Sequence, residues 1–142
     1  MGLLHHFGTR EQLLTALATE GFAALTDVLD AHPADIKAMG NAYVAWALAH
    51  PGHYAVMWQP RLVDESSPEL TGARQRAWTL LSSALAAAST AESPIAHEAD
   101  TYAAFAIVHG LASIWLSGTL TPPTDPATLT ALITERLTVA SC

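Results

Sequence analysis

Few residues in this sequence could do chemistry, and none forms a recognisable catalytic or metal-binding motif. His50 and His53 are separated by Pro51-Gly52, so they need not share a helical face, and no cysteine or third ligand lies at a zinc-site spacing. The sequence has no Gly-x-Ser-x-Gly motif, no phosphate-binding glycine loop and no paired acids on an apolar helix. We therefore predict no catalytic residue, no metal, no cofactor and no enzymatic activity.

Large apolar side chains at helical spacing are better candidates for binding a small molecule. Pockets for such molecules are mostly apolar with a few polar groups, which Tyr54, Tyr102 and His109 could supply here. The same residues could instead fill a core, as aromatic residues at this spacing usually do, and a lone histidine such as His109 is more often a hydrogen-bonded core residue. The candidate ligand-binding set is Trp46, Tyr54, Met57, Trp58, Trp78, Tyr102, Phe105 and His109.

The longest element that must position these residues is a predicted helix between Ser93 and Gly118. Ser93 suits an N-cap, Pro94 the first helical position and Gly118 a left-handed stop. Its second half is apolar nearly all round, whereas a surface helix has one apolar stripe. We therefore expect it to be buried on both sides, against its own bundle and against another chain. The apolar run Ala103–Leu116 is short for a bilayer and lacks flanking Lys or Arg, so we expect no membrane span.

The rest of the chain also reads as helices, and no stretch shows the alternation of a strand. Caps and prolines predict further helices that begin after Thr9, after Pro33, at about His53, at Pro68 and, for a last helix that ends at Ala140, at Pro126. In the Pro68 helix the expected inner residues are Trp78, Leu81 and Leu85, with Arg74 and Arg76 outside. The predicted fold is therefore all-α, a bundle of about six helices.

The composition limits the partners of the chain. Charged residues make up only 13% of it, which leaves little polar side chain to cover a monomer and favours self-association. The net charge of −7 with a single lysine opposes general nucleic-acid binding. Cys142 is the only cysteine, which favours a reducing cytoplasm, and Met1-Gly2-Leu3-Leu4 lacks the pattern of a signal peptide.

The segment Leu3–Leu14 resembles the end of the recognition helix in the TetR (tetracycline-repressor-like) family of transcription regulators. In that family a Leu-Tyr-x-His-Phe pattern is followed by a small polar pair, Lys, Glu and Leu. The matching residues are Leu3, His6, Phe7, Glu11 and Leu13, while Leu4 replaces the tyrosine and Arg10 the lysine. Ala42–Trp58 and Phe105–Gly118 resemble the ligand-binding half of a subgroup named for a Trp-His-Gly motif, with Val108 in place of the tryptophan before His109-Gly110.

The resemblance implies a ligand-sensing and dimerisation domain over residues 9–142, after a remnant of the recognition helix over residues 1–8. It implies a cytoplasmic repressor whose middle helices and long helix enclose a cavity for a small apolar effector. It also implies a homodimer in which the long and last helices form a four-helix bundle with their mates. The expected interface residues are Val108, Leu111, Ile114, Trp115, Leu129, Leu132, Ile133 and Leu137.

The same resemblance implies that His6 and Arg10 touch DNA phosphate in an intact regulator. Docking of a helix-turn-helix needs helices that precede these residues, so we expect these 142 residues not to bind operator DNA specifically. The alternatives from other classes are a small helical carrier or enzyme that binds an apolar ligand in the same cavity, and a purely structural interaction domain.

Overall fold

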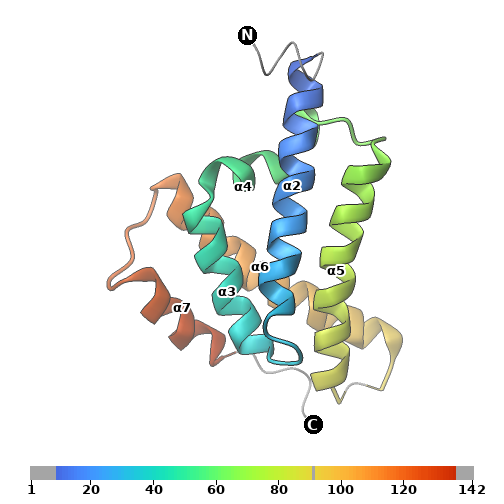
Figure 1. Ribbon diagram of the computed structural model, residues 1–142. Coiled ribbons are helices and arrows are strands. Elements are labelled where there is room, and N and C mark those ends of the chain that lie inside the picture. Colours follow the sequence, from blue (N-terminus) through green and yellow to red (C-terminus); the bar gives the residue numbers. More distant parts are fainter. Residues whose placement is uncertain (1–8, 91, 137–142) are drawn as a thin grey trace.

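The computed structural model describes residues 9–90 and 92–136, and over these ranges it is all-α, as predicted (Figure 1). A short 3-10 helix, η1 (Pro60–Leu62), precedes α5, and no strand occurs in the described ranges. The predicted recognition-helix remnant (1–8) and residues 137–142 lie outside the described residues. The last helix ends at Thr134 with Glu135 as its C-cap, so the predicted end at Ala140 is wrong. The α-helices are α2 (Arg10–Asp30), α3 (Ile36–Ala49), α4 (Pro51–Met57), α5 (Pro68–Ala88), α6 (Pro94–Ser117) and α7 (Pro126–Thr134).

Local capping explains where most of these helices begin and end. The side-chain oxygens of Thr9, Ser93 and Asp125 each accept a hydrogen bond from the backbone N–H three residues further on, at 3.0, 3.2 and 2.9 Å. Each bond satisfies one of the N–H groups that have no partner within the helix. Gly118 ends α6 with φ of 73°, in the left-handed region where a side chain would cost free energy. The predicted start and stop of the long helix are therefore confirmed.

The start of α4 differs from the prediction. The sequence places a break at Pro51-Gly52 and a helix from about His53, but α4 begins at Pro51. Proline fits the first turn of a helix because the N–H that it lacks would have no partner there, so Pro51 initiates the helix instead of interrupting the chain.

The helices form a bundle in which α2 and α3 occupy the middle (Figure 1). Helix α2 lies beside α5 and also contacts α4, while α3 contacts both α6 and α7, and α5 packs on α6. Between them lies one apolar core, whose fully buried side chains include Phe22, Met39, Val44 and Leu70.

Helices α2 and α4 approach each other closely at Gly21. A Cβ atom added to Gly21 would lie 2.5 Å from Met57 Sδ and 2.9 Å from Met57 Cγ. The Met57 side chain is itself only 3% exposed. The missing side chain of Gly21 therefore makes room for Met57.

Helix α6 is buried on one side only within the chain. Its buried residues are Thr101, Ala104, Val108 and Ala112, which recur at steps of three and four and so form one stripe. On other faces Tyr102 is 58% and Ile114 40% exposed. The sequence predicts that this helix is buried against its own bundle on one side and against another chain on the other. The first of these contacts is present, and the other side of the helix is exposed in the single chain.

Helix α6 is also the one described helix that is long and apolar enough to span a bilayer, with a mean hydropathy of 1.2. Length and composition are weak grounds for a membrane span, because the core helix of a soluble bundle meets the same criteria. Here the helix packs against α3 and α5 along its buried stripe.

Candidate ligand-binding site

A cavity of about 190 Å³ lies at the centre of the bundle, between α2, α3, α5 and α6. Trp58, at the C-cap of α4, closes one side of it. Nearly all of the wall is hydrocarbon or aromatic ring, and the polar side chains Arg74 and Gln75 lie at an edge that reaches solvent. The lining residues are Phe22, Leu25, Leu29, Ile36, Met39, Gly40, Tyr43, Trp58, Arg74, Gln75, Ala77, Trp78, Leu81, Leu85, Ala104, Phe105 and Val108.

Phe105 is the centre of the aromatic part of this wall. Its ring centroid lies 5.3 Å from that of Trp58, 5.9 Å from Trp78 and 6.1 Å from Tyr43. These are the edge-on and tilted arrangements that aromatic pairs prefer. Three of the residues predicted to bind ligand, Trp58, Trp78 and Phe105, thus meet at one cavity although they come from separate helices.

Two aromatic wall residues, Phe22 and Tyr43, are missing from the sequence-based set of ligand residues. Both sit on the apolar stripes that predict α2 and α3, and nothing in their spacing distinguishes a pocket-lining position from a core position. Only the neighbours contributed by other helices make that distinction.

The other predicted ligand residues lie away from the cavity wall. Trp46 stacks on His50 at 4.8 Å between ring centroids, and Met57 packs against Gly21. Tyr102 is exposed and contacts the outer side of the wall through Trp78, at 5.0 Å between centroids. Direct contact with a ligand in this cavity therefore remains a prediction best supported for Trp58, Trp78 and Phe105.

Behind the wall, Tyr43, Tyr54 and His109 form a polar cluster. Tyr54 Oη lies 2.6 Å from His109 Nδ1 and 2.9 Å from Tyr43 Oη, and Tyr43 Oη lies 3.2 Å from the same nitrogen. Burial raises the pKa of Tyr54 to about 12 and that of Tyr43 further above its ordinary value, so both phenols keep their protons near neutral pH. His109 stacks on Phe105 and is a hydrogen-bonded core histidine that supports the wall from outside.

Replacing His109 with glutamine is expected to make the stability of the fold less sensitive to acid. Burial lowers the pKa of His109 below its ordinary 6.5, so the unfolded chain binds a proton there at a higher pH than the folded chain does. Stability from this residue is thus present above pH 6.5 and is lost as the pH falls toward the folded pKa. Urea unfolding at about pH 7.5 and about pH 5.5 measures the loss, which should be smaller in the variant. An equal loss in both proteins would assign the acid sensitivity to other groups.

Arg74 occupies the solvent edge of the cavity, so the prediction that it lies outside the bundle is wrong. Its Nη2 donates to Glu65 Oε2 at 2.8 Å, and its Cζ lies 5.5 Å from the centroid of the Phe22 ring. The aliphatic stem of an arginine can cover apolar surface while its head stays near water. This explains how a charged residue shares the inner face of α5 with Trp78.

The described residues contain no group of three His, Cys, Asp or Glu side chains placed to hold a metal ion. His50 Nδ1 lies 3.0 Å from the backbone oxygen of Trp46, and His53 Nε2 lies 3.4 Å from Glu20 Oε1. These two histidines therefore have protein partners of their own.

We compared the chain with known protein families and solved structures. The family model described as "Tetracyclin repressor-like, C-terminal domain" matches residues 36–137, which is most of the chain. The chain belongs to this family. None of the curated proteins compared with the sequence matches it.

Two solved structures share the fold of this TetR-like domain. One is the structure of a protein with unknown function from Rhodococcus sp. RHA1, with a TM-score of 0.77 and 24% identity over 93% of this chain and 74% of the other. The second is the structure named "putative regulatory protein SCO4313", with a TM-score of 0.76 and 21% identity over 96% of this chain and 77% of the other. At these identities the likeness concerns the fold.

The residues expected at the dimer interface of this TetR-like domain differ in how exposed they are in the single chain. Val108 is 5% exposed and lines the cavity of its own chain, so it has no surface to offer a partner, and its assignment to the interface is wrong. Ile114 and Leu132 are exposed, whereas Leu111, Trp115, Leu129 and Ile133 are half-buried. Leu137 lies outside the described residues.

Of the two residues that the family resemblance places near DNA, only Arg10 lies in the part of the TetR-like domain that the structure describes. It is the first residue of α2 and is exposed. His6 lies outside the described residues. A phosphate contact by either residue remains a prediction.

Proposed function

We propose that this chain is the ligand-sensing and dimerisation domain of a cytoplasmic TetR-family repressor that responds to a small, largely apolar effector. The observation that carries the proposal is the central cavity, whose wall is apolar apart from one edge and includes the rings of Phe22, Tyr43, Trp58, Trp78 and Phe105. Family membership points to a regulator and not to an enzyme. Small-molecule sites are typically concave and apolar with a few polar groups, as this one is.

The size of the cavity limits the effector. An engineered protein cavity of about 150 Å³ lined by apolar residues stays dry and binds benzene. At about 190 Å³, the present cavity suits a body somewhat larger than one aromatic ring. The partly exposed edge at Arg74 and Gln75 leaves room for a substituent that projects toward solvent.

Thermal unfolding with propylbenzene, and with glycerol as a polar control, tests this function. A ligand at about 100 times its Kd stabilises the folded state by about 2.7 kcal/mol, which shifts Tm by several degrees for a domain of this size. Propylbenzene should also change the fluorescence of the protein, since two of its four tryptophans line the cavity. No shift with propylbenzene or with any other single-ring compound, substituted or not, would contradict the proposal.

The open face of α6 supports the dimer part of the proposal. Ala103, Ile107, Gly110 and Ile114 follow one another at steps of three and four, and each is exposed or half-buried in the single chain. Leu132 of α7 is also 54% exposed. Apolar side chains left open on two helices are what a two-fold partner would cover in a four-helix bundle.

Gly110→Arg is expected to abolish the dimer while leaving the chain folded. A Cβ atom at Gly110 has no other atom within 4 Å, so the single chain can hold an arginine there, and a glycine in a helix interior costs about 1 kcal/mol relative to better helix formers. A long charged side chain on the face shared with the partner would keep the two helices apart. Sedimentation velocity should give a dimer for the wild type and for Gly110→Ala, and a monomer with unchanged circular dichroism for Gly110→Arg. A dimeric arginine variant would remove this face from the interface.

A further inference from the structure

The polar side chains on the cavity wall supply hydrogen-bond donors that lack acceptors. Trp58 Nε1 is buried and has no hydrogen-bond partner. Arg74 carries five N–H donors, and its one described hydrogen bond is to Glu65. Buried polar groups are nearly always paired in folded proteins, so an unpaired indole N–H in a ligand cavity calls for an acceptor.

The side chains of Trp58 and Arg74 contact the same ring. The Trp58 ring centroid lies 5.4 Å from that of Phe22, edge-on, and the Arg74 guanidinium carbon lies 5.5 Å from the same centroid. Phe22 belongs to α2, Trp58 follows α4 and Arg74 lies on α5. Three elements therefore bring two donor-bearing side chains of the cavity wall to the same ring, Phe22.

We propose that the cavity binds a small organic carboxylate. The apolar body of this ligand fills the aromatic part of the cavity, and its carboxylate replaces that of Glu65 as the hydrogen-bond partner of Arg74. This inference rests on the proposed ligand-sensing function and specifies the class of effector. A carboxylate accepts hydrogen bonds only, and its two oxygens match the planar fork of a guanidinium.

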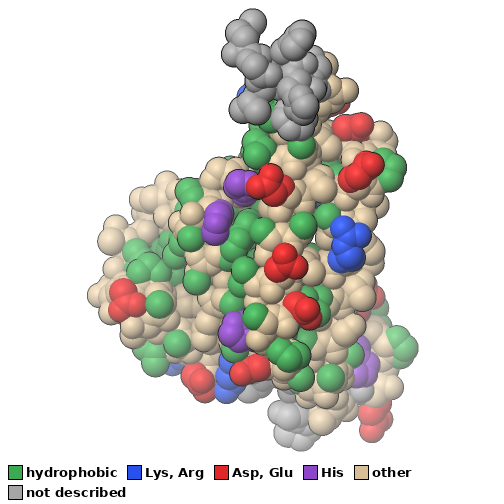
Figure 2. Space-filling view, viewed as in Figure 1, with side chains coloured by type: hydrophobic (Ala, Val, Ile, Leu, Met, Phe, Trp, Pro, Cys, Tyr) green, Lys and Arg blue, Asp and Glu red, His purple; other side chains and the backbone are tan. Residues whose placement is uncertain are grey.

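Charge decides between this class and its rivals. An organic cation would suit the aromatic rings but would lie beside the Arg74 guanidinium, which repels it. A plain hydrocarbon would fill the cavity but leave the Trp58 donor unpaired. Acidic side chains are spread over the face seen in Figure 2 and basic ones are sparse, in keeping with the net charge of −7. Arg74 is the basic residue among those that line the cavity, so it is the group there that attracts an anion.

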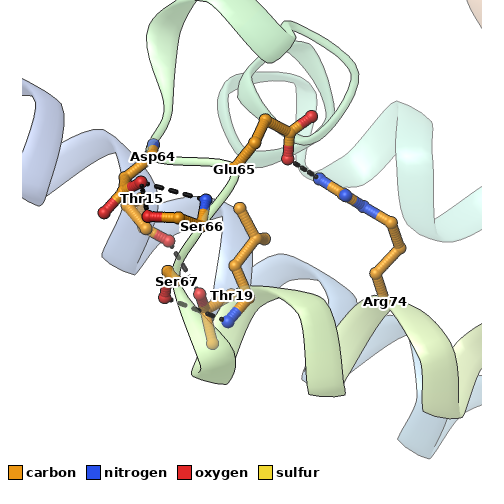
Figure 3. Close-up of polar contacts among 8 residues, drawn as sticks. Thr15, Thr19, Asp64, Glu65, Ser66, Ser67 and Arg74 are labelled. Carbon is orange, nitrogen blue, oxygen red and sulfur yellow. Dashed lines mark hydrogen bonds and ion pairs between the residues drawn. The ribbon is translucent and has the colours of Figure 1, made fainter.

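Glu65 can leave Arg74 without loosening the loop that carries it. Figure 3 shows hydrogen bonds that fix this loop without Glu65. The Asp64 N–H donates to Thr15 Oγ1 of α2 at 2.8 Å, and the Asp64 carboxylate accepts from both Ser66 N–H and Ser66 Oγ–H. Glu65 has 43% of its side chain exposed, and an exposed ion pair adds at most about 1 kcal/mol. A ligand carboxylate that meets Arg74 at the cavity edge, less exposed to water, can therefore compete with it.

Calorimetric titration with 3-phenylpropanoate, its neutral analogue 3-phenylpropanamide and propylbenzene tests the proposal. The acid should bind the wild type about tenfold more tightly than the amide, because a hydrogen bond to a charged group exceeds a neutral one. Arg74→Gln should lower the affinity for the acid to that for the amide and leave the affinity for propylbenzene unchanged. Arg74→Lys should restore part of the preference, since it keeps the charge without the planar fork.

Glu65→Gln is the matched variant, since it removes the carboxylate that competes with the ligand for Arg74 and keeps the shape of the side chain. It should tighten binding of the acid by about threefold and leave the amide unchanged. The inference is overturned if propylbenzene or the amide binds and the acid binds no more tightly, or if Arg74→Gln weakens all three compounds alike. In either case the ligand-sensing function stands. If none of the three compounds binds, the proposed function fails and this inference with it.

Discussion

Gly21→Val is expected to lower the free energy of unfolding by about 3 kcal/mol, the upper end of the usual cost of overpacking a core. The first added carbon would lie 2.5 Å from Met57 Sδ and 3.5 Å from His53 Cβ, and the two further methyl groups need additional space. Met57 is buried on its other sides, so it cannot simply move into solvent. The helix α4 must shift away from α2, which disturbs the end of α4 that places Trp58 at the cavity.

Gly72→Ala is the matched control, because Gly72 is also a glycine inside a helix. The nearest atom to an added Cβ there is Arg76 Nη1, at an ordinary 3.4 Å, on a flexible side chain. This variant should gain up to about 1 kcal/mol from helix propensity. Urea unfolding followed by circular dichroism measures both variants. A Gly21→Val protein as stable as the wild type would show that α2 and α4 are not tightly packed at Met57.

Phe105→Ala is expected to have the largest effect on ligand binding, with affinity for propylbenzene reduced by about tenfold or more. Phe105 contacts Tyr43, Trp58, Trp78 and His109, so its removal takes away a wall and the ring that orders its neighbours. Loss of a buried phenylalanine costs about 3–5 kcal/mol, and the half-buried position of Phe105 places the loss in stability near the lower figure. Trp58→Ala should weaken binding in the same direction.

Tyr102→Ala provides the control for this effect, because Tyr102 is on the same helix and touches only the outer side of the wall through Trp78. It should change affinity by less than about threefold. Fluorescence titration measures the affinity and sedimentation velocity measures the proposed dimer, so the two roles proposed for α6 are tested separately. Equal affinity of Phe105→Ala and wild type would remove Phe105 from the site, and a lost dimer with intact binding would place it at the interface.

The hydrogen bonds of three polar residues behind the cavity wall already use their side-chain polar atoms. Tyr43, Tyr54 and His109 contact one another and the back of Phe105, so their polar atoms are used within the fold. The cluster packs against Phe105 and Trp58 of the cavity wall.

The sequence by itself determined the helices, because the signals that start and stop a helix lie within a few residues of its ends. Thr9, Ser93, Gly118 and Asp125 act on neighbouring backbone groups and could be identified without any knowledge of the fold. Periodicity likewise predicted that Trp58, Trp78 and Phe105 face inward. It could not separate a cavity from a filled core, since both have the same spacing.

The tertiary structure decided which inward-facing residues line the cavity and which charged residue lies at its edge. Arg74 lies four residues after buried Leu70 and four before Trp78, but its charge led to the expectation that it lies outside the bundle, and only the folded chain shows it at the cavity edge. Phe22, Tyr43 and Val108 all line the cavity because of where α2, α3 and α6 cross. Such crossings depend on contacts between segments far apart in the chain, which no local pattern of residues encodes.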